Sequence, residues 1–102
     1  MRVLHLDWGR WMRGGQHQAL RLAAALQTMG VECLLAAPPG AALLEAARRE
    51  GVPAEPLRPL GLRRLAERFD LLHCHDARSH TVAALAAPRP FVVSRRVDFP
   101  VK

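Results

Sequence analysis

The stretch RVLHLDWGRWMRGGQHQALRLAAALQTMGVECLLAA, residues 2–37, decides the fold of this chain. The apolar run from Val3 to Trp8 has the length of a buried strand. After the pair Gly14 and Gly15, apolar residues recur at helical spacing as far as Gly30, and a second apolar run, Val31 to Ala37, follows at once. The apolar stripe of the helix consists of Ala19, Leu22, Ala23, Leu26 and Met29. The stretch therefore predicts strand, glycine turn, helix and strand, which together form one βαβ unit.

The glycine pair occupies the position in this unit where an anion would bind. The turn leaves the carboxyl end of the first strand and opens the helix, so free backbone N–H groups and the positive end of the helix dipole face one small volume. Gly14 and Gly15 lack the spaced glycines of the dinucleotide fingerprint and the Lys-Ser/Thr of a P-loop. The sequence therefore argues against NAD binding and against ATP hydrolysis.

The rest of the chain continues to alternate between strands and helices. Pro38 and Pro39 end the second strand, and helical patterns follow at residues 41–50, at 61–69 and after Asp76. Further strands are predicted at residues 52–57, 70–74 and 91–94, the first of them at a sheet edge because two prolines interrupt it. The pattern predicts one Rossmann-like α/β domain over residues 1–102, a doubly wound parallel sheet of five strands. Right-handed crossovers favour the strand order 3-2-1-4-5.

Composition narrows the class of protein. Fifteen basic and nine acidic residues give a net charge of +6, but the arginines are scattered and no aromatic stacking pair accompanies them, so nucleic acid is disfavoured as a partner. No apolar run approaches the roughly 20 residues of a membrane span. We expect a soluble, cytoplasmic protein, with peripheral membrane association left open. Cys33 and Cys74 lie inside apolar runs and are expected to be buried, reduced thiols.

Cationic side chains gather where the predicted strand order reverses, between the first and fourth strands. Ligands of open α/β sheets bind at such a switch point, outside the carboxyl ends of the strands. The loops that meet there carry the basic residues Arg10, Arg13, His75, Arg78, Arg95 and Arg96 and the acidic residues Asp76 and Asp98. A helix N-terminus beside several guanidinium groups predicts a site for a phosphorylated or otherwise anionic ligand.

The histidines have structural as well as functional interpretations. His5 and His73 lie inside predicted strands, where a packed and hydrogen-bonded role is expected, whereas His75 at the end of its strand could contact a ligand or bond to the neighbouring loops. Successive strand residues point to opposite faces, so we expect no metal centre in the set His73, Cys74, His75, Asp76 and His80.

Three segments together resemble a known family: RGGQHQALRLAAALQTMGVECLLAAPPG, RFDLLHCHDARSHTVAALA and FVVSRRVDFPV. Their order is similar to that in the amino-terminal domain of family 4 glycosyltransferases, which have the GT-B architecture of two facing Rossmann-like domains. The resemblance implies the acceptor-side domain of a retaining transferase of the hexosyltransferase type. Such an enzyme moves a sugar from a nucleoside diphosphate sugar, its donor substrate, to a sugar or lipid-linked acceptor without a cofactor.

The same resemblance implies roles for individual residues. Gly14 and Gly15 match the loop beside the donor diphosphate, and His75 belongs to the family's loop after the fourth strand. Arg96 stands where many members carry a histidine near the reacting sugar. We therefore expect His75 and Arg96 to be catalytic. The expected substrate-binding residues are Arg13, Gly14, Gly15, Asp76, Arg78 and Arg95.

A complete member of that family has a second domain that holds most of the nucleotide sugar. We therefore expect residues 1–102 alone to be inactive, and the open edge of the last strand leaves room for a homodimer of the fragment. Two other functions remain open from the sequence. One is a free-standing anion- or nucleotide-binding module without catalysis. The other is an interaction fragment whose basic surface docks an acidic partner.

Overall fold

A parallel sheet organises the computed structural model, which describes residues 1–9, 14–58, 61–75 and 91–93. Its central strands are β1 (Arg2–Leu6), β2 (Glu32–Ala37) and β4 (Leu71–Cys74), and the short strand β3 (Ala54–Pro56) lies at the edge beside β2. The order β3-β2-β1-β4 confirms that part of the prediction. On the other side of β4, the strand β5 (Phe91–Val93) pairs in parallel with it.

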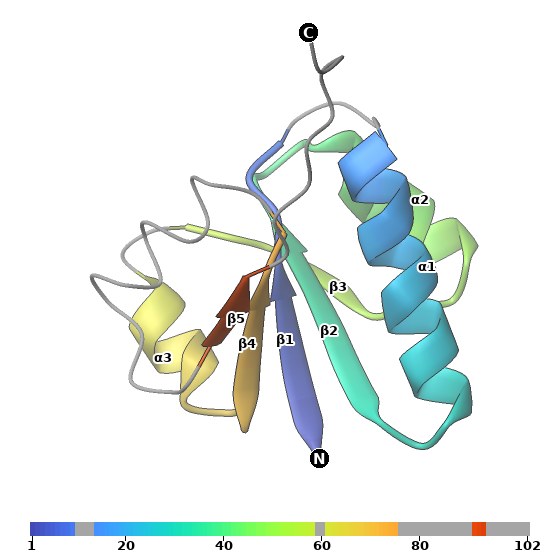
Figure 1. Cartoon of the computed structure of the whole chain (residues 1–102). Helices are drawn as coiled ribbons and strands as arrows, with labels where there is room; N and C mark the ends of the chain where they lie inside the picture. The colour runs from blue at the N-terminus through green and yellow to red at the C-terminus, as the bar shows by residue number, and fades with distance from the viewer. Residues whose placement is uncertain (10–13, 59–60, 76–90, 94–102) are drawn as a thin grey trace, which may run out of the picture.

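Helices cover both faces of this sheet, as a doubly wound fold requires (Figure 1). The helices α1 (Gly14–Thr28) and α2 (Ala42–Arg49) pack on one face, and α3 (Leu62–Ala66) packs on the other. Right-handed crossovers produce this distribution, because the chain moves one way along the sheet from β1 to β3 and crosses back to β4.

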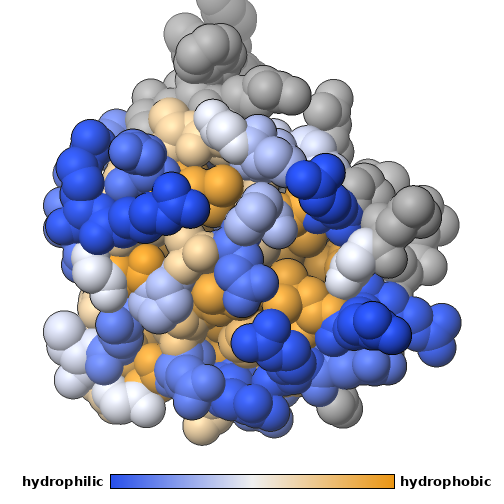
Figure 2. Space-filling view, turned by 180° about the vertical axis from the view of Figure 1, so that it is seen from behind, coloured by the Kyte–Doolittle hydropathy of each residue, from blue (hydrophilic) through white to orange (hydrophobic). Residues whose placement is uncertain are grey.

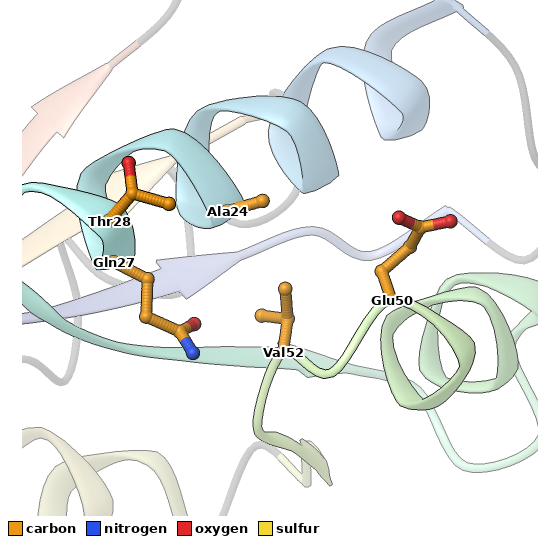
Figure 3. A pocket seen from close by; sticks show the side chains of 5 residues that line it. All are labelled: Ala24, Gln27, Thr28, Glu50 and Val52. Atoms are coloured by element: carbon orange, nitrogen blue, oxygen red, sulfur yellow. The ribbon is translucent and has the colours of Figure 1, made fainter.

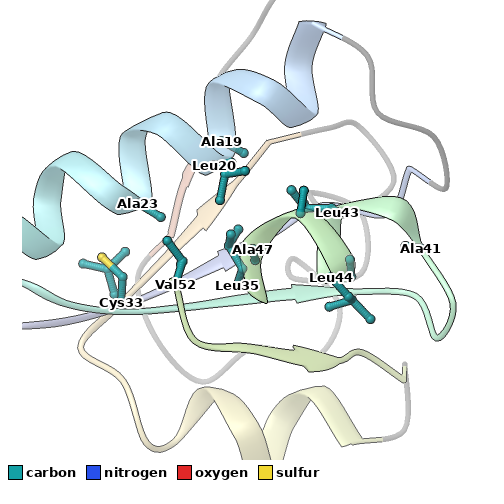
Figure 4. Packing of buried hydrophobic residues seen from close by; sticks show 13 residues of the cluster. Ala19, Leu20, Ala23, Cys33, Leu35, Ala41, Leu43, Leu44, Ala47 and Val52 are labelled. Atoms are coloured by element: carbon teal, nitrogen blue, oxygen red, sulfur yellow. The ribbon is translucent and has the colours of Figure 1, made fainter. Parts of the chain in front are cut away.

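The larger of two hydrophobic clusters lies between the sheet and helices α1 and α2 (Figure 4). Leu35 of the central strand β2 and Leu43 of α2 are fully buried within it. Alanines on both helices allow a close approach to the sheet; they are Ala19, Ala23, Ala46 and Ala47. Small helical residues facing branched strand residues thus explain the tight packing of this layer.

The second cluster lies between the opposite face and α3. Leu4 and Leu6 of β1 alternate with Val3, which packs in the first cluster, as the two-residue period of a strand requires. Leu62 and Phe69 cover them from α3 and its end. Because β1 is buried on both faces, its sequence reads as a nearly continuous apolar run.

The helix and strand ends differ in places from the prediction. Met29 was expected in the buried stripe of the first helix but is 76% exposed, because α1 ends at Thr28 and Met29 lies in the following turn. Leu20 is buried instead. Trp8 lies beyond β1, whose last residue is Leu6, and packs against the second cluster. Gly30 has φ of 87°, the left-handed conformation in which glycine commonly ends a helix.

The described surface carries many of the charged side chains. Arg63, Arg64 and Arg68 of the α3 segment are exposed and form a solvated basic face. On the face shown in Figure 2, hydrophilic side chains surround smaller areas of hydrophobic surface. Cys33 and Cys74 are buried free thiols, as expected. Among the residues with a described structure, no helix combines the length and the apolarity that crossing a membrane requires.

Candidate functional site

The candidate site lies at the carboxyl edge of the sheet, where β1 and β4 end side by side. The last residues of the two strands, Leu6 and Cys74, are partners in the parallel register. The residue that follows each strand then forms a backbone hydrogen bond to a neighbouring strand. Asp7 donates its backbone N–H to the carbonyl of Ala36 at 3.1 Å, and His75 donates its own to the carbonyl of Leu6 at 2.9 Å. The loops that leave β1 and β4 therefore start from fixed positions.

A buried carboxylate anchors the first of these loops. Asp7 is 1% exposed, and its Oδ1 atom accepts hydrogen bonds from the backbone N–H of Gly9 and from Nε2 of Gln16, both at 2.8 Å. Gln16 is the third residue of α1, so these bonds connect the end of β1 to the start of the helix across the loop. The anchor thereby fixes where the glycine pair Gly14 and Gly15 opens the helix.

Gly9 is required by this anchor. A Cβ atom added at Gly9 would come within 2.0 Å of Gln16 Nε2 and within 3.2 Å of Asp7 Oδ1. A side chain at this position must therefore shift the flexible end of Gln16, which disturbs its bond to the carboxylate.

Three histidines form a cluster beside the anchored loop. His5 of β1 and His73 of β4 are partners in the register, and His75 lies two residues further along the same face as His73. His5 Nδ1 and His75 Nε2 share a hydrogen bond of 3.0 Å, and the rings of His73 and His75 stack with centroids 4.0 Å apart. On the other side of His5, its Nε2 atom lies 3.4 Å from the Sγ atom of Cys33 in β2.

Burial controls the charge of His5. Desolvation, with a smaller contribution from the neighbouring His73, lowers the pKa of His5 from 6.5 to about 4. His5 is therefore neutral at physiological pH. Burial also raises the pKa of the Cys33 thiol, which keeps it protonated and unreactive.

The structure brings together only some of the predicted site residues. Gly14 and Gly15 are the first two residues of α1, and His75 is buried directly after β4. The other predicted site residues lie outside the described part of the chain; they are Arg13, Asp76, Arg78, Arg95 and Arg96. The expectation of a packed, hydrogen-bonded core histidine is confirmed for His5.

One argument from the sequence was wrong in its geometry. Alternation along a strand does separate Cys74 from the two histidines beside it, and Cys74 packs in the opposite cluster. His73 and His75, however, are two residues apart, so the same alternation places both on one face. His5 of the neighbouring strand joins them there, which sequence spacing did not indicate.

Sequence reasoning also missed Asp7 and Gln16. The pattern of an aspartate just after a strand and two residues before a glycine is typical of a side chain that bonds the backbone two residues on. That pattern could have identified the bond from Gly9 to Asp7. The partner Gln16 could not be found in this way, because it depends on how α1 returns over the sheet.

A shallow pocket of about 230 Å³ lies elsewhere (Figure 3). Ala24, Gln27 and Thr28 of α1 line it together with Glu50 and Val52. Thr28 precedes β2 and Val52 precedes β3, so the pocket is at the edge where the strands begin, opposite the candidate site. Its one charged residue is acidic, which does not suit the anionic ligand predicted from the sequence.

Comparisons with solved structures show the same fold in larger proteins. The Anabaena protein Alr3699/HepE in complex with UDP superimposes with a TM-score of 0.81 at 19% identity, over 91% of this chain and 29% of that one. The complex of that protein with UDP-glucose superimposes with a TM-score of 0.73 at 21% identity, over 91% of this chain and 28% of that one. A glycosyltransferase from Rickettsia africae ESF-5 superimposes with a TM-score of 0.65 at 14% identity, over 97% of this chain and 31% of that one. The chain thus spans less than a third of the length of these proteins.

Sequence comparison identifies the family directly. No curated protein matches the chain at a significant level. The model of Glycosyltransferase Family 4, however, matches residues 12–99, a range that includes the glycine pair, His73, His75 and the strand β5. Since this match extends over most of the 102 residues, the chain belongs to glycosyltransferase family 4.

Proposed function

We propose that this chain is the acceptor-side domain of a retaining glycosyltransferase, which transfers a hexosyl group from a nucleoside diphosphate sugar to a sugar or lipid-linked acceptor. The observation that carries the proposal is the junction of β1 and β4 in a chain of family 4. There the backbone N–H of His75 bonds the end of β1, while Asp7 bonds β2 through its backbone and Gln16 in the first turn of α1 through its carboxylate. With β5 beside β4, the order 3-2-1-4-5 makes this junction the switch point of the sheet.

The proposed roles follow from the chemistry of the leaving group. Transfer releases a nucleoside diphosphate, whose developing charge must be stabilised in the transition state. In the proposal, the N–H groups at Gly14 and Gly15 and the guanidinium of Arg13 face the diphosphate. The arginines Arg78 and Arg95 add positive charge from the later loops.

His75 and Arg96 are proposed to act nearest the reacting sugar, with Asp76 binding a substrate hydroxyl. The described geometry supports an orienting role for His75, because its backbone N–H and its ring are both held. A ring held in one orientation contributes through positioning, which lowers the entropy cost of reaching the transition state.

The nature of the donor is supported by the similar proteins. Alr3699/HepE was crystallised with UDP and with UDP-glucose. A uridine diphosphate sugar is therefore the first donor to test for the longer protein that contains this chain.

The test is a transfer assay with that longer protein and with UDP- and GDP-sugars, read by NMR of the first-formed product. We expect the anomeric configuration of the donor to be retained, and we expect residues 1–102 alone to show no turnover. An inverted product would contradict the retaining mechanism. Binding of UDP without transfer to any sugar or lipid-linked acceptor would instead favour the nucleotide-binding module.

A further inference from the structure

Three imidazole groups converge on one face at the carboxyl edge of the sheet. His5 comes from β1, His73 from β4, and His75 directly follows β4. Each ring offers one nitrogen atom to a ligand, and these three nitrogen atoms all lie within 4.8 Å of one another. The parallel register fixes this triangle, because it sets His5 opposite His73 and leaves His75 one strand period further along.

The distances are close to those that a metal ion requires. Tetrahedral zinc binds histidine nitrogen at about 2.0 to 2.1 Å, which separates two ligand nitrogens by about 3.4 Å. His5 Nδ1 and His75 Nε2 are already 3.0 Å apart. The rings of His73 and His75 stack at an interplanar angle of 23°, so binding requires rotation of these side chains until their ring nitrogens face one ion.

The surroundings of His5 suit a ligand. When Nδ1 binds a metal, the ring proton is on Nε2, and this atom lies 3.4 Å from the Sγ atom of Cys33. Histidine ligands usually donate their second ring N–H to such a partner, which fixes the ring and its tautomer. Burial also keeps His5 neutral, and the neutral imidazole is the form that binds metals.

His73 is the most accessible of the three histidines. His5 is fully buried and His75 is 5% exposed, whereas His73 is half-buried. A cation would therefore reach the cluster past His73, with water or another ligand as its fourth partner. Three histidines with an open fourth position form a known ligand set for zinc.

We propose that His5, His73 and His75 form a binding site for a divalent transition-metal ion, with Zn²⁺ as the first candidate. Three imidazoles without a carboxylate select zinc, copper, nickel or iron over calcium and magnesium. The inference does not depend on transferase activity, because it rests on the geometry of the cluster alone.

The test is a calorimetric titration of the full chain, first freed of metal by a chelator, with ZnCl₂ at pH 7.5. We expect one equivalent to bind. His73→Gln should weaken the affinity by more than about tenfold, since even partners that only orient a ligand contribute 10- to 100-fold. His17→Gln is the matched control: it removes an exposed histidine of α1 and should leave the affinity unchanged.

A second measurement needs no variant. In a ¹⁵N-labelled chain, one equivalent of Zn²⁺ should shift the ring nitrogen resonances of His5, His73 and His75 and leave those of His17 in place. Cobalt as a probe should give the intense visible absorption of a tetrahedral ion. Absence of binding, or binding that His73→Gln leaves intact while the ring resonances stay unchanged, would overturn the proposal.

Discussion

At the scale of single residues, the site contains buried polar groups that form hydrogen bonds with distant parts of the chain. The carboxylate of Asp7 and the rings of His5 and His75 are nearly inaccessible, and each has partners from a different part of the chain. Burial of such groups is costly unless they are bonded, so removal of one partner should cost more than a surface contact would. Two predictions follow at this scale.

Gly9→Ala should destabilise the protein by about 1.5 to 3 kcal/mol, the usual range for losing a hydrogen bond to a charged group. The new Cβ atom would lie 2.0 Å from Gln16 Nε2 and must push that group from Asp7. The measurement is urea unfolding. Gly61→Ala is the matched control, since no atom lies within 4 Å of its Cβ position. In a Gln16→Ala background the effect of Gly9→Ala should largely disappear; an undiminished cost there would contradict the steric explanation.

The second prediction concerns pH. His5 has a native pKa of about 4 against 6.5 for the free group, so between these values the unfolded chain binds a proton that the native chain does not. The free energy of unfolding should therefore fall as the pH decreases from 6.5 to 4, by up to about 3 kcal/mol. Denaturant unfolding of the metal-free chain at a series of pH values measures this. His5→Gln should flatten the dependence and His17→Gln should not; equal slopes in both variants would argue against His5 as the cause.

At the scale of elements, the two helix layers are held by apolar burial and not by their ion pairs. The helix α2 carries a buried apolar residue and an exposed ion pair on adjacent turns. Leu43 is fully buried against the sheet, whereas Glu45 and Arg48 form an ion pair of 3.9 Å between side chains that are 68% and 63% exposed. An exposed pair at this distance contributes little, because water and salt screen it.

Leu43→Ala should therefore lower the free energy of unfolding by about 2 to 5 kcal/mol, through lost burial and the cavity that remains. Glu45→Ala on the same helix should change it by less than about 1 kcal/mol. Parallel denaturant titrations of the two variants measure the contrast. If both substitutions had similar effects, α2 would not be held by the first hydrophobic cluster as described.

At the scale of the whole molecule, the proposed transfer depends on a cleft at the carboxyl edge of the sheet. The chain spans only 29% of the Alr3699/HepE chain that it matches, so the prediction concerns the longer protein that contains it. Gly15 lies in the first turn of α1, at the place proposed for the diphosphate. In the proposal its role is steric, because a helical backbone position accepts other residues.

In that longer protein, Gly15→Val should abolish transfer while the fold survives, because a branched side chain occupies the space of the ligand. Arg13→Ala should reduce binding by about 1 to 3 kcal/mol, the contribution of one charge-assisted hydrogen bond. Steady-state kinetics with donor and acceptor measure both, with circular dichroism as the check on folding. Full activity of Gly15→Val with unchanged KM values would place the cleft elsewhere.

The sequence alone determined the architecture, because local patterns encode it. Apolar runs, helical periodicity and glycine stops predicted β1, α1, β2 and α2 to within about two residues, and right-handed crossovers then fixed the order of the first four strands. The prolines of residues 52–57 correctly placed that strand at an edge. Met29 was misassigned because periodicity does not show where the last helical turn ends.

Only the tertiary structure decided which polar groups meet. The bond from Asp7 to Gln16 depends on how α1 returns over β1, and the cluster of His5, His73 and His75 depends on the register between strands 68 residues apart. A strand's own period shows which residues share a face, but not which residue of another strand stands opposite. That register is set by the packing of both hydrophobic clusters at once, and so it cannot be read from any single segment.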